Sequence, residues 1–130
     1  MWDIETQHCL QTIVGHRCEI WSLASSNSNN NNTDSTNVTL VTGSSDEFIR
    51  GYRLKDHPSE STSSKINDSD EVLEYFGCVQ RSTSGTNDKC RGLRFNPTGE
   101  LLAVVSGGKT VEIFKVLSYK LYIHIYLYIE

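Results

Sequence analysis

His16 and Asp46 are the two residues of this sequence whose chemistry first suggests a catalytic pair. His16 follows Gly15, and Asp46 closes the turn-forming run Gly-Ser-Ser-Asp further along the chain. A histidine paired with a carboxylate can act as a general base in proton transfer. No serine or cysteine near the pair stands in a recognisable nucleophile elbow, the strained turn that exposes an attacking side chain. We therefore predict no catalytic residue and interpret the pair as structural.

A second set of candidates, His8, Cys9, His16 and Cys18, carries side chains that bind zinc. Their spacing matches no standard zinc pattern, and successive side chains of a strand point to opposite faces, which would separate them. The glycine-containing turns at residues 43–45 and 107–109 lack the Gly-x4-Gly-Lys-Ser/Thr frame of a phosphate-binding loop. We therefore predict no metal, no cofactor and no small-molecule substrate.

Length and charge narrow the class of protein. The chain has 130 residues, enough for one ordinary domain, and a formal net charge of −4, which gives no general electrostatic reason to bind nucleic acid. Its four cysteines form no Cys-x-x-Cys pair, and the acidic N-terminus lacks a hydrophobic signal segment, so we expect reduced thiols. No apolar run reaches the ~20 residues that cross a bilayer, and we predict no membrane segment.

Short apolar runs separated by glycine, proline, asparagine and serine predict an all-β fold. Residues 1–4 are expected to end a strand. Further strands are predicted at residues 8–14, 18–24, 38–42, 48–54, 72–80, 92–95, 101–105 and 110–116. The polar tracts at residues 25–37 and 55–71 are expected to be disordered loops, because they are too polar to be buried. Residues 81–89 are expected to form a further loop.

The last segment, residues 119–130, is almost unbroken in its apolar and aromatic character and has a high strand propensity. Two interpretations stay open for it. It is either a buried strand or a non-native end, such as read-through past a truncated reading frame.

Two units of the chain repeat. The runs Tyr52-Arg53-Leu54 and Phe114-Lys115-Val116 end equivalent strands, as does Trp2-Asp3-Ile4. Residues 40–44, in the preceding strand, match residues 103–107 in pattern. Residues 48–52 match residues 110–114. The second unit is the more degenerate, since it has no Gly-His and no aspartate in its turn.

With Trp2-Asp3, Gly15-His16 and Asp46, the sequence resembles the WD40 repeat family. The resemblance implies part of a β-propeller, with about one complete blade, most of a second and an orphan edge strand. It also implies a structural tetrad of His16, Thr42, Asp46 and, where the family has tryptophan, Tyr52. In such a tetrad the carboxylate orients the imidazole, which passes a hydrogen bond on to the hydroxyl.

The expected organisation follows from this resemblance. A WD40 blade with its preceding strand occupies residues 1–54, a polar insertion residues 55–71, a degenerate blade residues 72–118 and an atypical tail residues 119–130. Because the chain begins inside a blade and ends soon after Leu117, we expect a fragment or a truncated gene model.

Residues 2–17, 76–81 and 111–117 further resemble the WD-repeat subunits of the U3 small nucleolar RNA-associated complex. That resemblance implies a non-enzymatic scaffold of the small-subunit processome, acting in 18S pre-rRNA processing and small ribosomal subunit biogenesis in the nucleolus. Its partners would be protein subunits of the complex, with contact to U3 RNA or pre-rRNA through that complex. The alternative is another WD40 adaptor, such as a substrate receptor of a ubiquitin ligase or a chromatin module.

Overall fold

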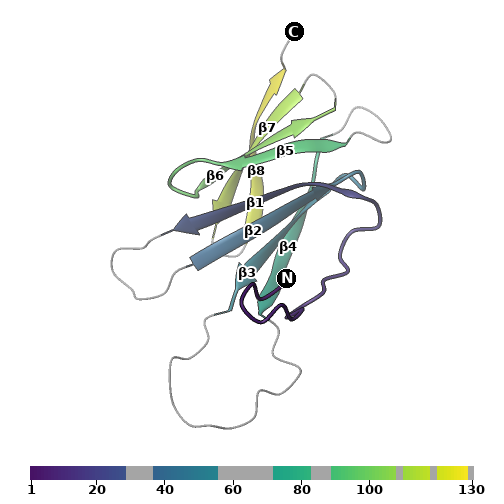
Figure 1. Cartoon of the computed structure of the whole chain (residues 1–130). Helices are drawn as coiled ribbons and strands as arrows, with labels where there is room; N and C mark the ends of the chain where they lie inside the picture. Colours follow the sequence, from purple (N-terminus) through teal and green to yellow (C-terminus); the bar gives the residue numbers. More distant parts are fainter. Residues whose placement is uncertain (29–36, 56–71, 83–88, 108–109, 118–119, 129–130) are drawn as a thin grey trace.

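The structure, a computed structural model, describes residues 1–28, 37–55, 72–82, 89–107, 110–117 and 120–128 (Figure 1). These residues form two antiparallel sheets of four strands each, and within each sheet the strands follow one another in chain order. The first sheet consists of β1 (Ile20–Ser28), β2 (Asn37–Ser44), β3 (Phe48–Leu54) and β4 (Leu73–Gln80). The second consists of β5 (Cys90–Phe95), β6 (Leu101–Ser106), β7 (Thr110–Leu117) and β8 (Lys120–Tyr128). The predicted all-β fold is confirmed.

No helix of the described residues is long and apolar enough to cross a membrane. In β6 every second side chain is buried, since Leu102, Val104 and Ser106 point inward. This alternation is the pattern of sheets that bury one face and leave the other open.

β1 extends further than the sequence predicts, because residues 25–28 continue it. Residue 37, predicted to lie in the same loop, begins β2. A ladder of backbone hydrogen bonds does not require apolar side chains, so Ser25 and Ser26 pair with Leu40 and Thr39 despite their polarity. Placing these residues in a disordered loop was therefore wrong. The rest of that loop, residues 29–36, lies outside the described residues, as do residues 56–71 and 83–88.

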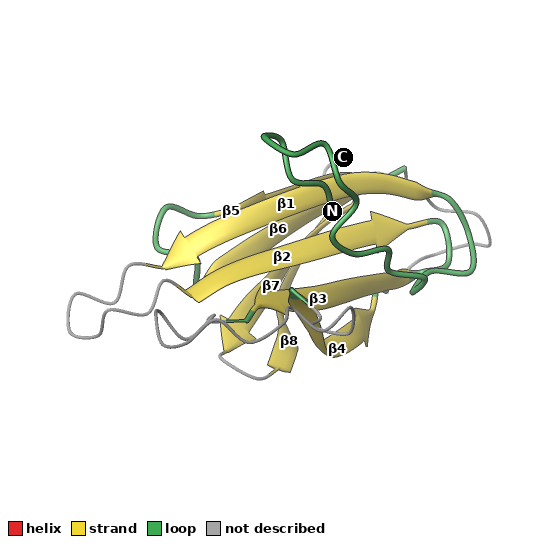
Figure 2. Cartoon of the chain, turned by 60° about the horizontal axis from the view of Figure 1, so that its bottom comes forward, coloured by secondary structure: helices red, strands yellow, loops and turns green. Residues whose placement is uncertain are grey.

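The strands predicted at residues 1–4 and 8–14 are absent. This segment is a loop throughout (Figure 2), and its only strand-like contact is an isolated bridge between Trp2 and Cys9. A strand needs a partner along its length, and no described strand pairs with this segment. Its link to the first sheet is a side chain instead, because the amide of Gln11 bonds to the backbone of Leu73.

The atypical tail contains a strand. β8 pairs antiparallel with β7 along its length, from Thr110 opposite Tyr128 to Leu117 opposite Lys120. It therefore forms the outer edge of the second sheet. That the tail is non-native stays a prediction, as does the division into domains.

The register of the two sheets corrects the alignment of the two units. In the first sheet Leu40 lies opposite Tyr52, and in the second Leu102 lies opposite Phe114. Residue 40 therefore corresponds to residue 102, one position before the sequence match. The run from Leu101 to Val105 is apolar at every position, so its pattern could not reveal which residues point inward. A slip of one residue exchanges the two faces of a strand.

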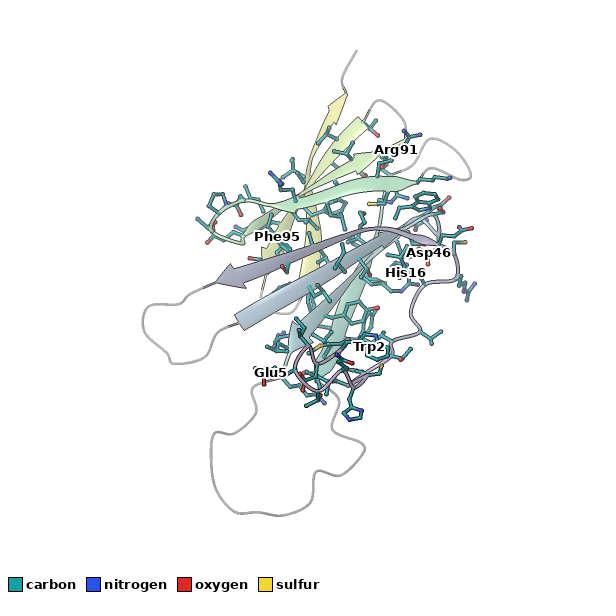
Figure 3. All side chains as sticks on the ribbon, in the orientation of Figure 1. Trp2, Glu5, His16, Asp46, Arg91 and Phe95 are labelled. Atoms are coloured by element: carbon teal, nitrogen blue, oxygen red, sulfur yellow. The ribbon has the colours of Figure 1, made fainter. Side chains whose placement is uncertain are left out.

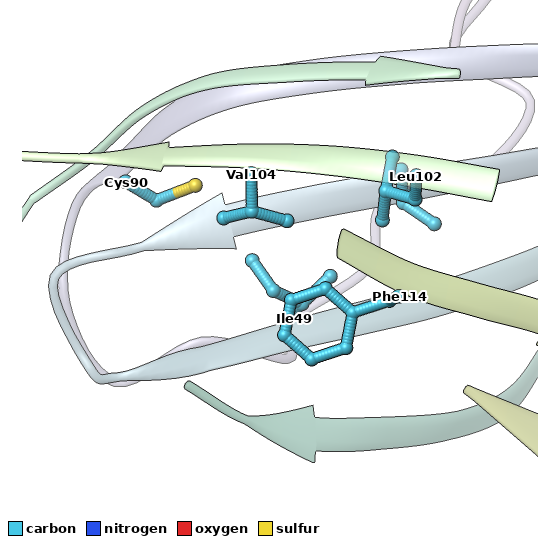
Figure 4. Packing of buried hydrophobic residues seen from close by; sticks show 6 residues of the cluster. Ile49, Cys90, Leu102, Val104 and Phe114 are labelled. Atoms are coloured by element: carbon cyan, nitrogen blue, oxygen red, sulfur yellow. The ribbon is translucent and has the colours of Figure 1, made fainter. Parts of the chain in front are cut away.

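The core lies between the two sheets (Figure 4). Six side chains in it are fully buried: Val41 and Ile49 from the first sheet, and Cys90, Leu102, Val104 and Phe114 from the second. Gly43 allows the sheets to approach closely, because a Cβ at this position would meet the Cys90 sulfur and lie 2.8 Å from Ser22 Oγ.

Candidate functional site

The four residues predicted to form a tetrad come from four parts of the chain, in and beside the first sheet. His16 lies in the segment before β1, Thr42 in β2, Asp46 in the turn between β2 and β3, and Tyr52 in β3. Val41 packs in the core, so its neighbour Thr42 points to the opposite face of the sheet. The segment that carries His16 covers this face, as Figure 3 shows for His16 beside Asp46.

Two of the contacts that hold this segment in place are made by its residues outside the tetrad. The Gln11 side chain donates to the Leu73 carbonyl at 3.0 Å and accepts from the Leu73 N–H at 2.7 Å. Gly15 packs directly on β3, where a Cβ would lie 2.5 Å from the Tyr52 hydroxyl oxygen. Glycine before the histidine allows this close approach, which brings His16 to the sheet.

His16 makes hydrogen bonds through both ring nitrogens. Its Nδ1 lies 2.9 Å and 3.0 Å from the two carboxylate oxygens of Asp46, and its Nε2 lies 2.7 Å from Thr42 Oγ1. A carboxylate accepts only, so Nδ1 carries the proton, and Nε2 accepts from the Thr42 hydroxyl. The tautomer is therefore assigned from the network.

Asp46 is the centre of the network. Its carboxylate also accepts from Arg50 Nη1 at 2.7 Å, from the Arg17 N–H at 3.1 Å and from the Phe48 N–H at 3.2 Å. Burial alone would raise the pKa of Asp46, but the hydrogen bonds from Arg50, His16 and the two backbone amides outweigh it and lower the pKa well below 3.8. Arg50 Nη1 also contacts His16 Nδ1, so three polar side chains share this point.

Tyr52 completes the chain of contacts. Its side chain is buried, and its ring packs against Tyr75 with centroids 5.8 Å apart. Burial raises the pKa of the Tyr52 hydroxyl, and a hydrogen bond with Thr42 opposes that shift. The structure therefore brings together all four residues of the expected tetrad, in the order Asp46, His16, Thr42 and Tyr52.

Carboxylate, imidazole and hydroxyl in a row also resemble the parts of a hydrolytic triad. Here, however, the side chains of His16 and Asp46 are only 2% and 6% exposed, and Thr42 is 7% exposed. A substrate carbonyl has to reach both the hydroxyl and a set of oxyanion donors, and the Thr42 hydroxyl instead lies against Tyr52. The arrangement holds the segment before β1 to the sheet.

The residues that were weighed as metal ligands and rejected do not gather in the structure. Cys9 and Cys18 are exposed, and His16 faces Asp46 rather than a cysteine. Among the residues that the structure describes, no three His, Cys, Asp or Glu side chains are arranged to hold a metal ion.

A second polar group, which sequence reasoning missed, joins the two sheets. Arg81 is only 3% exposed, and its guanidinium donates to Ser106 Oγ at 2.6 Å and to the Ser44 carbonyl at 3.0 Å. Glu112 is also buried and accepts from the Ser82 N–H at 2.7 Å. One feature of the sequence could have indicated this buried polar group: Glu112 is a charged residue in the apolar run of β7.

Comparison with known families agrees with this geometry. The family model described as WD domain, G-beta repeat, matches residues 7–53 and 77–115, which together cover more than half of the chain. The chain belongs to the WD40 repeat family. The first matched range contains the segment with His16, β1, β2 and all but the last residue of β3, and the second runs from within β4 into β7. WD40 repeats typically form non-enzymatic surfaces for protein interaction, and no curated protein matches this chain.

The second WD40 repeat lacks the hydrogen-bonded residues of the first. In the register of the two sheets, Val104 and Phe114 stand where Thr42 and Tyr52 stand in the first. Both are fully buried against the first sheet, whereas Thr42 and Tyr52 face the segment with His16. Equivalent faces of the two sheets are thus covered differently: the first by the segment with His16 through the polar tetrad, and the second by the first sheet through the apolar core.

Proposed function

We propose that this chain is a non-enzymatic WD-repeat scaffold of the U3 small nucleolar ribonucleoprotein, acting in 18S pre-rRNA processing within the small-subunit processome. The observation that carries the proposal is the run of residues 2–17, which resembles the WD-repeat U3 small nucleolar RNA-associated protein 12. WD40 sequences vary most in such segments, so this run is more informative than the strands. The site of action is then the nucleolus.

The exposed surface of residues 2–17 supports a role in binding protein partners. This run contains the side chains of Ile4 and Val14, which are 92% and 93% exposed, and of Trp2, which is 67% exposed. A contiguous patch of exposed apolar side chains marks a surface that binds other proteins, and we infer that these side chains belong to such a patch. Partner subunits of the U3-associated complex are the proposed occupants, and U3 RNA or pre-rRNA is contacted through that complex.

The test is affinity purification of the tagged chain from cells that carry its gene, followed by measurement of bound RNA. We expect enrichment of U3 RNA over a spliceosomal small nuclear RNA, and nucleolar fluorescence of the tagged chain. The variant Ile4→Ala with Val14→Ala should lower U3 recovery several-fold without a change in Tm. The control Leu101→Ala removes a large apolar side chain of β6, outside this run, and should retain U3.

Enrichment of ubiquitin-ligase subunits or histones without U3 RNA would refute the proposal and favour the alternative, a WD40 adaptor of another complex. Equal U3 recovery by all variants would refute the role given to Ile4 and Val14. Depletion of the protein should in addition cause precursors of 18S rRNA to accumulate.

A further inference from the structure

β1 and β5 run side by side although no backbone ladder joins them (Figures 1 and 2). Each is the first strand of its sheet, so each has one edge whose alternate N–H and C=O groups point away from its partner strand. Near their beginnings the strands are linked, because Ser22 Oγ donates to the Cys90 carbonyl at 3.0 Å. Toward their ends they separate.

A groove of about 400 Å³ lies where they separate. It is bounded by residues 23–26 of β1, by residues 93–95 of β5 and by the turn that follows β5, and its exposed lining consists mainly of polar atoms. Figure 3 shows Phe95 in the space between the two strand ends. This volume is within the range of ~300–1,000 Å³ that is usual for binding pockets.

The chemistry of the lining is uneven. Leu23 is exposed, Leu93 and Phe95 are partly buried against the core, and Ser25 provides a hydroxyl. Arg94 is the one charged side chain among the described residues that line the groove, and it makes no ion pair with any of the described residues. The turn residue Asn96 is occupied, because its amide donates to Thr98 and accepts from the Leu101 N–H.

We propose that this groove binds an extended acidic segment of a partner protein. The peptide backbone pairs with the open edges of β1 and β5, which offer donors and acceptors at strand spacing. Apolar side chains at every second position contact Leu23, Leu93 and Phe95, and a carboxylate between them pairs with Arg94. One cation in a groove whose exposed lining is mainly polar suits a single carboxylate better than the repeated phosphates of a nucleic acid.

This inference goes beyond the scaffold role, because it assigns a peptide site to named residues whichever complex the chain joins. The two can fail separately. The chain can recover U3 RNA without binding the peptide at this groove, and it can bind the peptide without recovering U3 RNA.

The test is fluorescence anisotropy with the full chain and a short labelled peptide of alternating valine and aspartate. Arg94→Gln removes the cation, and Arg91→Gln is the matched control, because Arg91 is also an exposed arginine of the same strand and lies outside the groove. Arg94→Gln should raise the Kd about threefold to fivefold, the scale of an exposed ion pair, while Arg91→Gln changes it little. Both variants should keep the Tm of the native chain.

Three comparison ligands complete the design. A peptide with asparagine in place of aspartate should bind the native chain more weakly than the acidic peptide does. The Arg94→Gln variant should bind the two peptides with equal affinity. A peptide with a central proline should lose most of its affinity, because proline has no N–H and cannot continue a strand. Equal effects of the two arginine variants, unaltered binding of the proline peptide, or Arg94-dependent binding of an oligouridine that displaces the acidic peptide would each overturn the proposal.

Discussion

Replacement of Asp46 by asparagine is the sharpest test of the hydrogen-bonded network beneath the N-terminal segment. Asparagine has nearly the same shape as aspartate, but it carries no charge and turns an NH2 group toward the donors His16 and Arg50. Hydrogen bonds to charged groups contribute about 1.5–3 kcal/mol each. Because asparagine keeps one acceptor oxygen, we expect a net loss of about 3 kcal/mol in the free energy of unfolding at pH 7.

Urea denaturation followed by tryptophan fluorescence measures this loss, with an unchanged m-value showing that the denatured state is the same. The control is Glu74→Gln, which removes an exposed carboxylate of β4 and should change stability by less than about 0.5 kcal/mol. A loss below about 1 kcal/mol for Asp46→Asn would refute the reasoning.

The pH dependence gives a second, independent check. The folded state lowers the pKa of Asp46 below its usual 3.8, so the carboxylate stabilises the fold above that pH. This stabilisation is lost as the pH falls below about 4 toward the folded-state pKa. The gap in stability between the native chain and Asp46→Asn should therefore narrow below pH 4, and a gap that stays constant from pH 7 to pH 3 would contradict the assigned role.

Three further predictions follow from the packing. Gly43→Ala should destabilise the chain by about 1–3 kcal/mol, because its Cβ meets the Cys90 sulfur, and Cys90→Ala should recover part of that loss in a double-mutant cycle. Thr42→Val should lower the free energy of unfolding by about 1–3 kcal/mol in urea denaturation, because it leaves His16 Nε2 without a donor. This loss is expected although valine is the natural residue at the equivalent position of the second sheet. Alkylation with iodoacetamide, followed by mass spectrometry, should modify the exposed thiols of Cys9, Cys18 and Cys78 well before the Cys90 thiol. The Cys90 thiol is buried, and burial raises its pKa.

Local sequence signals predicted β3 correctly, but they also predicted a strand at residues 8–14, where none forms. β3 was predicted with its bounds, because its turn and its alternation are both local signals. Residues 8–14 alternate loosely between polar and apolar residues, yet they form no strand, because no described strand pairs with them. A pattern predicts a strand only where a partner is available.

The polar sites likewise include residues that were predicted from the sequence and residues that were not. His16, Thr42, Asp46 and Tyr52 were predicted through the family resemblance, and the structure brings them together. Arg81 was missed, because nothing in the sequence around it indicates that it enters the space between two sheets. Its burial depends on Ser106 and Ser44, which lie far from it in the sequence.

By itself, therefore, the sequence determined the fold class, the turns and the residue types of the tetrad, since alternation and turn chemistry act over a few neighbouring residues. The tertiary structure decided which face of each strand is buried, how far β1 extends and where β1 and β5 separate to form a groove. Those features depend on contacts between residues far apart in the chain. The His16 and Asp46 pair belongs to both levels, because its chemistry is visible in the sequence and its burial in the fold makes it structural.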